Sequence, residues 1–315
     1  MPSTITTIDA DYFHPQIASI HMLSNNGHAA FIDTGTHYSM ANVEKTMQDH
    51  DIPADSVDWV ILTHIHLDHA GGAGSMMQLF PNAKLVVHPF GSRHMADPSK
   101  LIAGTQAVYG KDQTKRIYGD ILPIDATRII ETYDGMTLDL QGEELLFLDT
   151  PGHAKHHHCI YHHASRSCFT GDTLGLAYPH FTNTTTGKAC LLPTTTPVQF
   201  SPQDLHNSID KVMALQPNTL YLTHYGPIQI DSNLIARLHE HIEAYVLLAE
   251  QSLQQDFTDQ QEQYAWLNQQ INGYMVRQVM DNQPSIEQAE VEKLLSMDAG
   301  LNAQGLIVWL QKKHS

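Results

Sequence analysis

The sequence predicts an α/β fold whose sheet is covered by helices, followed by a helical C-terminal region. Three observations support this prediction. Short apolar segments alternate with helical stretches through most of the first 230 residues. Several of these segments end in a Thr followed within three residues by a His or an Asp, at the strand ends where α/β sheets place their sites. Beyond Gly226, apolar residues recur at helical spacing instead.

The first half of the chain repeats a strand and helix pattern. Residues 29–35 form an apolar run that ends in Asp33 and a turn, and a helical stretch follows from about 39 to 50. Residues 59–64 are the next apolar strand, with a Gly-rich start to a helix near 75–80 and another strand at 84–88. This order predicts a sheet with helices packed on it.

The periodicity fades between residues 88 and 133, where Pro and Gly are frequent. We expect a long excursion over the site with short helices, because long loops in compact domains are often functional lids. After it, residues 136–140 and 144–148 alternate in hydrophobicity around Gly142 and predict a hairpin.

Four side chains able to bind a metal fall within six residues of one loop, between the strand ending at Leu62 and a Gly-rich helix start. They are His64, His66, Asp68 and His69. His64 and His66 can converge only if the chain is not helical there, since helix positions two apart differ by roughly 200°. Asp68 and His69 are adjacent and diverge, so the four side chains suit two neighbouring ions better than one.

Further strand ends carry the same kinds of side chain. Apolar runs lead into His153, Asp172 and His224, and Asp33 ends the run at 29–35. Five strand ends could therefore deliver these groups to one rim of the sheet.

These residues, in this order and preceded by the turn Asp33-Thr34-Gly35, resemble the metallo-β-lactamase superfamily over residues 5–230. The resemblance implies an αββα sandwich with a dinuclear centre at one edge. It implies that Asp172 bridges both metals, that Asp68 and Asp172 are the catalytic carboxylates, and that Asp33 lies outside the ligand shell. It assigns His64, His66 and His153 to the first metal, and Asp68, His69 and His224 to the second.

The ligand chemistry agrees with such a centre. Imidazole and carboxylate without thiolate suit two divalent ions, with zinc as the first choice and iron or manganese as alternatives. Paired cations lower the pKa of a shared water, so we expect hydrolysis of a small ester or thioester by a metal-bridging hydroxide.

Departures from the family pattern reduce the number of branches of the superfamily that this sequence could represent. An Asp at position 172 argues against antibiotic hydrolysis as the native activity, and His66 replaces the Glu of the flavodiiron branch. Glyoxalase II-like and other thioesterases, lactonases and iron-dependent persulfide dioxygenases remain. The alternatives are a lactonase or phosphodiesterase with the same centre, or a metal-bearing sensor or binding protein with little turnover.

Composition sets limits on partners and location. There are 17 Lys and Arg against 34 Asp and Glu, a net charge of -17, so we expect a small-molecule substrate and neither nucleic acid nor membrane as a partner. We find no signal peptide and no apolar run long enough to span a membrane. Three cysteines are too few for a disulfide framework, which predicts a reduced, cytoplasmic protein.

Other residues receive secondary roles. Tyr178 and Tyr225 are candidates to hydrogen-bond a substrate oxygen, and Cys168 is predicted to be a buried small hydrophobe. His88 and His94 could line the pocket. The remaining clustered histidines are expected to be exposed or satisfied in the core, because consecutive strand residues alternate faces. These are His156, His157, His158, His162 and His163.

The C-terminal region predicts helices at 233–255, 258–281, 285–297 and 302–313, with breaks at Pro284 and Gly300. We therefore predict a catalytic domain at 1–230 and a helical subdomain at 231–315. Its apolar stripe indicates packing onto the sandwich or a homodimer interface. The other interpretation is a helical cover that shapes an acyl pocket.

Overall fold

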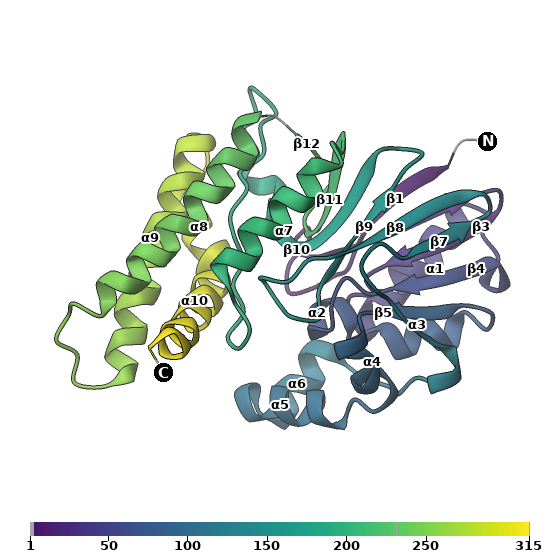
Figure 1. Ribbon diagram of the computed structural model, residues 1–315, viewed down its shortest axis with the longest axis horizontal. Coiled ribbons are helices and arrows are strands. Elements are labelled where there is room, and N and C mark those ends of the chain that lie inside the picture. Colours follow the sequence, from purple (N-terminus) through teal and green to yellow (C-terminus); the bar gives the residue numbers. More distant parts are fainter. Residues whose placement is uncertain (1–2, 231, 315) are drawn as a thin grey trace. The chain divides into compact units, whose positions relative to one another are not determined.

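The computed structural model describes residues 3–230 and 232–314 and has a mixed α/β fold (Figure 1). The chain divides into two compact units. Unit 1 comprises residues 3–149, 156–171 and 215–227, and unit 2 comprises 150–155, 172–214, 228–230 and 232–314. The predicted domain boundary falls at Asp231, outside the described residues, and stays a prediction.

The first sheet of unit 1 has six strands in the order β1-β2-β3-β4-β5-β6. These are β1 (Thr4–Asp9), β2 (Ser19–Asn25), β3 (His28–Ile32), β4 (Val57–Ile61), β5 (Lys84–Val87) and β6 (Ile129–Glu131). The first three strands are antiparallel and the pairs from β3 to β6 are parallel. The predicted strands at 29–35, 59–64 and 84–88 are confirmed, whereas β1, β2 and β6 were not predicted.

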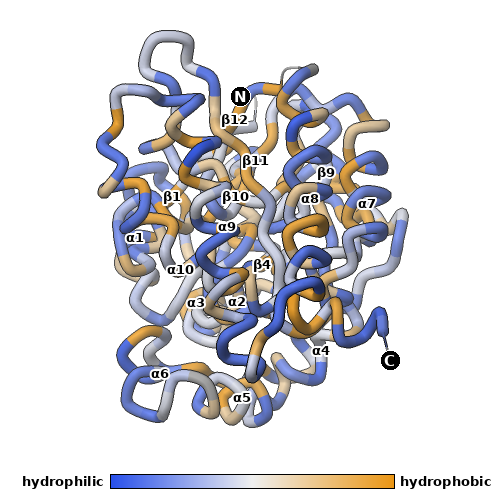
Figure 2. Tube along the Cα trace, turned by 90° about the vertical axis from the view of Figure 1, so that its left-hand side faces the viewer, coloured by the Kyte–Doolittle hydropathy of each residue, from blue (hydrophilic) through white to orange (hydrophobic). Residues whose placement is uncertain are grey.

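Parallel neighbours need crossover connections, which here are helical. They are α1 (Met40–Asp49), α2 (Leu67–Ala70), α3 (Ala73–Leu79), α4 (Pro89–Ala96), α5 (Ser99–Tyr109) and α6 (Lys111–Tyr118). The expected short helices of the 88–133 excursion are therefore confirmed. Figure 2 shows that α6 is hydrophilic along most of its length, as expected for a helix with one face in solvent.

The second sheet places β11-β10-β9-β8-β7 side by side. Its strands are β7 (Thr137–Leu140), β8 (Glu143–Asp149), β9 (His158–His162), β10 (Ser167–Leu176) and β11 (Thr219–His224). The predicted hairpin is confirmed, because Leu140 pairs with Glu143 across a two-residue turn. Both turn residues, Gln141 and Gly142, have positive φ, which suits the right-handed twist of the two strands.

The core of unit 1 lies between the two sheets. Apolar side chains from both sheets are fully buried against one another. The set is Leu23, Ala30, Ile32, Ile61, Val86, Leu140, Leu145, Phe147, Ile160 and Phe169. Burial of each larger side chain contributes about 1.5–3 kcal/mol, so the core fixes the strand ends that carry the polar groups.

Unit 2 is mainly helical. It contains β12 (Ile228–Gln229), α7 (Pro202–Ala214), α8 (Ser232–Ser252), α9 (Gln260–Asn282) and α10 (Gln288–Lys313). The predicted helices at 233–255 and 258–281 and the break at Pro284 are confirmed, whereas α7 was not predicted. No helix in the described parts of the chain is both long enough and apolar enough to cross a membrane.

The predicted break at Gly300 is wrong, because α10 runs through it without interruption. A Cβ at Gly300 would lie 3.1 Å from the Tyr264 hydroxyl of α9, and one at Gly305 would lie 2.4 Å from Oγ1 of Thr195. Both glycines therefore permit close packing, which offsets the helix propensity cost of about 1 kcal/mol each.

Candidate metal centre

The loop after β4 holds four of the predicted ligands in unit 1. His66 is the N-cap of α2 and has an extended backbone, so the chain that carries His64 and His66 is not helical. Nε2 of His64 lies 2.7 Å from Nδ1 of His66, and the rings of His64 and His69 have centroids 4.0 Å apart. This loop conformation brings the imidazoles together.

Asp68, His69 and His224 form a group that could hold an ion, since their ligand atoms all lie within 4.8 Å of one another. Oδ2 of Asp68 is 3.3 Å from Nε2 of His224 and 3.8 Å from Nε2 of His69. Asp68 lies in the first turn of α2, and His224 is the last residue of β11. Two imidazoles and a carboxylate at this spacing suit a zinc-type cation.

Asp33 is fully buried and lies directly beyond β3, with a φ of 59°. Its carboxylate accepts hydrogen bonds from the Thr63 amide at 2.8 Å, the Thr63 hydroxyl and the Thr223 hydroxyl at 2.6 Å. Oδ2 of Asp33 also lies 2.8 Å from Nδ1 of His69. The buried carboxylate accepts a hydrogen bond from Nδ1–H, which leaves the Nε2 lone pair of His69 for a metal.

The other imidazole of this group is oriented by the segment just before β2. Nδ1 of His224 donates to the carbonyl of Ile17 at 2.9 Å, so its Nε2 faces Asp68. Behind it, Nε2 of His21 donates to the carbonyl of Leu222 at 3.0 Å. Burial lowers the pKa of His21 to about 4, so this imidazole is neutral at neutral pH. Sequence reasoning missed His21, because β2 itself was not predicted.

Unit 2 holds the remaining two predicted ligands, His153 and Asp172. Nε2 of His153 lies 3.4 Å from Oδ2 of Asp172, and its Nδ1 lies 3.3 Å from the carbonyl of Thr194. Both side chains are buried. The preceding Gly152 has a φ of 132°, and a Cβ there would lie 2.3 Å from the backbone nitrogen of Leu205. A glycine is therefore required for the turn that presents His153.

Sequence reasoning also missed a group of tyrosines near Asp68. Burial, and then the charge of Asp68, raise the pKa of the Tyr12, Tyr109 and Tyr118 hydroxyls. The Tyr12 and Tyr118 hydroxyls are 3.3 Å apart and share a hydrogen bond. Phe13 packs edge-on against Tyr12 and is 49% exposed, which leaves an aromatic surface open to solvent. The only sequence signal for Tyr109 and Tyr118 was that both lie in the segment expected to pass over the site.

The two tyrosines proposed from the sequence differ in environment. Tyr178 is buried in unit 2 and donates its hydroxyl to the carboxylate of Asp298, 3.2 Å away. Tyr225 is half-buried, and burial followed by the charge of Asp9 raises its pKa to about 12. The Tyr225 hydroxyl is therefore protonated at neutral pH, and the roles of both tyrosines towards a substrate stay predictions.

The other singled-out residues have these positions. Nε2 of His88 lies 3.3 Å from Asp149, and its Nδ1 accepts from the Phe90 amide at the start of α4. His94 lies in the last turn of α4. Cys168 is fully buried, as predicted. In the part of the chain that the structure describes, the candidate metal groups do not include His156, His157, His158, His162 or His163.

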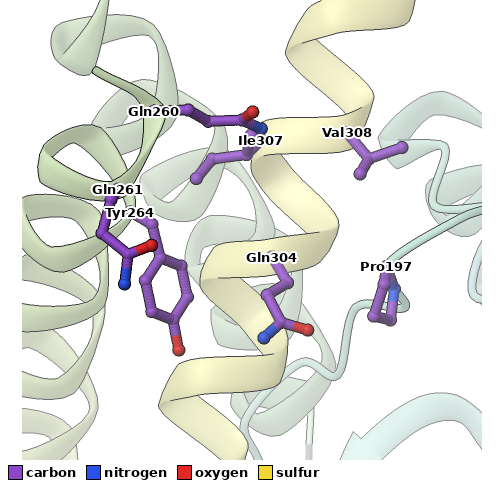
Figure 3. A pocket seen from close by; sticks show the side chains of 7 residues that line it. All are labelled: Pro197, Gln260, Gln261, Tyr264, Gln304, Ile307 and Val308. Carbon is purple, nitrogen blue, oxygen red and sulfur yellow. The ribbon is translucent and has the colours of Figure 1, made fainter. Parts of the chain in front are cut away.

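A cavity of about 430 Å³ lies in unit 2, where Gln304, Ile307 and Val308 of α10 face Tyr264 of α9 and Pro197 (Figure 3). Two glutamines of α9 complete its described lining, which contains no His, Asp, Glu, Lys or Arg. This cavity therefore lacks the groups that acid–base or metal chemistry requires.

Comparison with known proteins identifies relatives of this chain. The family model described as the metallo-beta-lactamase superfamily matches residues 15–224. The metallo-beta-lactamase fold-containing protein ST1585 of Sulfurisphaera tokodaii is 26% identical over 216 residues, which cover 67% of this chain and 74% of that protein. Thioesterase pkgB of Emericella nidulans is 28% identical over 52% of this chain and 38% of its own length. A hydroxyacylglutathione hydrolase of Salmonella gallinarum is 29% identical over 49% and 46%.

Solved structures show the same fold. The ST1585 structure, titled as from Sulfolobus tokodaii, has a TM-score of 0.62 at 23% identity and covers 88% of this chain and 98% of its own. The metallo-beta-lactamase family protein TTHA1429 of Thermus thermophilus has a TM-score of 0.64 at 18% identity and covers 99% and 94%. The predicted sandwich of two sheets flanked by helices, with a C-terminal helical extension, is confirmed.

Proposed function

This chain belongs to the metallo-β-lactamase superfamily of metal-dependent hydrolases, and we propose that it cleaves a small ester or thioester at a dinuclear centre. The observation that supports this proposal most directly is the pair formed by Asp33 and His69. The buried Asp33 carboxylate orients the His69 ring so that its Nε2 is directed towards Asp68 and His224. Such a carboxylate behind a histidine is the usual arrangement around a catalytic metal.

The proposed centre uses the seven ligands that the sequence predicts. His64, His66 and His153 would hold one ion, and Asp68, His69 and His224 the other, with Asp172 shared. Two bound cations, zinc first and iron or manganese as alternatives, would supply a water of lowered pKa and polarise the substrate carbonyl. The nitrogen and oxygen donors of this set fit such ions, and the three cysteines are buried outside it.

Two relatives support cleavage of an acyl bond, because one is named a thioesterase and another a hydroxyacylglutathione hydrolase. This chain spans less than half of each of those proteins, so we assign their activities to it only as a proposal. The three free, buried cysteines suit a reducing compartment, and we extend the proposal to a cytoplasmic location.

The residues around Asp68 favour a neutral carbonyl as the reacting group. The Tyr12 and Tyr118 hydroxyls stay protonated and can donate to a carbonyl oxygen as negative charge develops there. Phe13 and Tyr109 are 49% and 40% exposed and offer a flat surface for an aryl or long acyl group. The loops that carry the ligands contain almost no Lys or Arg to bind a phosphate: Lys155 follows His153, and Lys188 and Arg93 lie farther along the chain from the ligands.

We predict hydrolysis of aryl or CoA-type thioesters or of lactones that exceeds hydrolysis of a bis-aryl phosphate at equal concentration. A carbonyl substrate needs only polarisation and a hydroxyl donor, whereas a phosphodiester brings a charge that the acidic loops repel. Steady-state kcat/KM on matched chromogenic substrates checks this. A tenfold preference for the phosphodiester, about 1.4 kcal/mol of transition-state stabilisation, would make the phosphodiesterase alternative the better assignment.

A further inference from the structure

Helices α7 and α8 of unit 2 contact one another (Figure 1). Each carries a matched pair of a histidine and an acid. On α7, His206 precedes Asp210 by four residues, and on α8, His239 precedes Glu243 by four. Residues four apart lie on the same face of a helix, so each helix presents one imidazole and one carboxylate to the other.

The four side chains are joined crosswise. Nε2 of His206 on α7 lies 2.8 Å from Oε1 of Glu243 on α8, and Nε2 of His239 on α8 lies 3.3 Å from Oδ1 of Asp210 on α7. The two Nδ1 atoms lie 2.6 Å from each other, and the rings stack with centroids 4.9 Å apart. Each imidazole therefore has a carboxylate at one nitrogen and the other imidazole at its second.

This arrangement directs two lone pairs at one point. The carboxylates accept hydrogen bonds from the Nε2–H groups of both rings, which leaves Nδ1 of His206 and Nδ1 of His239 as acceptors. Two acceptors at 2.6 Å repel each other unless a proton or a cation lies between them.

We propose that His206 and His239 bind a divalent transition-metal ion of the zinc type through their Nδ1 atoms. Glu243 and Asp210 orient the two rings, and solvent completes the coordination. The side chains of His206 and His239 are 17% and 27% exposed, so ion and water can reach them. Bonds of about 2.1 Å require the nitrogens to separate to roughly 3.3 Å, which a small rotation of either ring provides.

This site is separate from the proposed hydrolase function and ties α7 to the C-terminal helices. The residue before His206 is Leu205, whose backbone contacts Gly152 in the turn that presents His153. An ion between α7 and α8 therefore restrains the helix on which that turn rests.

Calorimetric titration of the metal-loaded, desalted enzyme with Zn²⁺ tests the proposal. We expect wild type to bind one further ion per chain and both His206→Ala and His239→Ala to lose it. Glu243→Gln, which keeps the shape but not the charge, is expected to weaken binding by about 10-fold or more. His163→Ala is the matched control, because His163 pairs with Glu144 at 3.4 Å on an exposed surface and is expected to titrate like wild type.

Circular dichroism and the original metal content establish that each variant is folded, and Cu²⁺ electron paramagnetic resonance gives a second readout. Couplings to two imidazole nitrogens are expected in wild type and His163→Ala, and are expected to be lost in His239→Gln. No further ion in wild type, or binding of equal strength in the His206 and His239 variants, would overturn the proposal. Because the assay counts ions, a failure of the hydrolase proposal would leave this result unchanged.

Discussion

Asp172→Ala is expected to lower kcat by at least about 10²-fold and to release one of two bound ions. The proposed centre assigns the Asp172 carboxylate to both ions, and catalysis by a shared hydroxide needs both. The side chain is buried beside His153. Steady-state kinetics on a thioester and elemental analysis of the same preparation measure both effects.

Asp256→Ala is the control for this experiment, because Asp256 is an exposed carboxylate in unit 2. It should keep wild-type turnover and metal content. If Asp172→Ala retained full activity and both ions, the assignment of a bridging ligand at this position would be wrong.

The second large effect is expected for Asp33→Asn, which should weaken metal binding by about 10- to 100-fold. An amide has nearly the shape of the carboxylate, but it cannot accept from Thr63, Thr223 and His69 together. At least one buried donor is left unsatisfied, which costs about 1–3 kcal/mol of folding free energy. Chelator competition measures the affinity and urea unfolding measures the stability.

Asp58→Asn provides a matched comparison, since Asp58 pairs with His28 at 3.0 Å but is partly exposed. Metal affinity should be unchanged in that variant. Equal chelator resistance in Asp33→Asn and wild type would show that the Asp33 carboxylate does not orient a ligand.

The strands that carry the site could be predicted because their burial is visible in sequence. Residues 29–32 and 85–87 are apolar on both faces, as central parallel strands must be, and the two runs end at the polar residues Asp33 and His88. The hairpin at Gly142 was predictable for a similar local reason, since its turn needs positive φ. Metal binding by the loop at 62–72 could also be predicted from the sequence, because its ligands lie within one short segment.

Other features depend on contacts between distant segments and left no local signal. Tyr12 meets Tyr118 across 106 positions, and the charge of Asp68 acts on both hydroxyls. At Gly300 the local signal was misleading. Glycine often marks the end of a helix, but here its lack of a side chain lets α10 approach Tyr264 of α9. The helix α7, and with it the pair formed by His206 and His239, was likewise not predicted from periodicity.

The central claim is a dinuclear centre, and metal counting tests it most directly. Protein expressed with supplemented zinc, iron or manganese and then desalted should contain close to two divalent ions per chain at that centre. The seven predicted ligands divide into two sets that share Asp172, which is why two ions are expected. Elemental analysis that returns well under one ion per chain under every supplement would contradict the account.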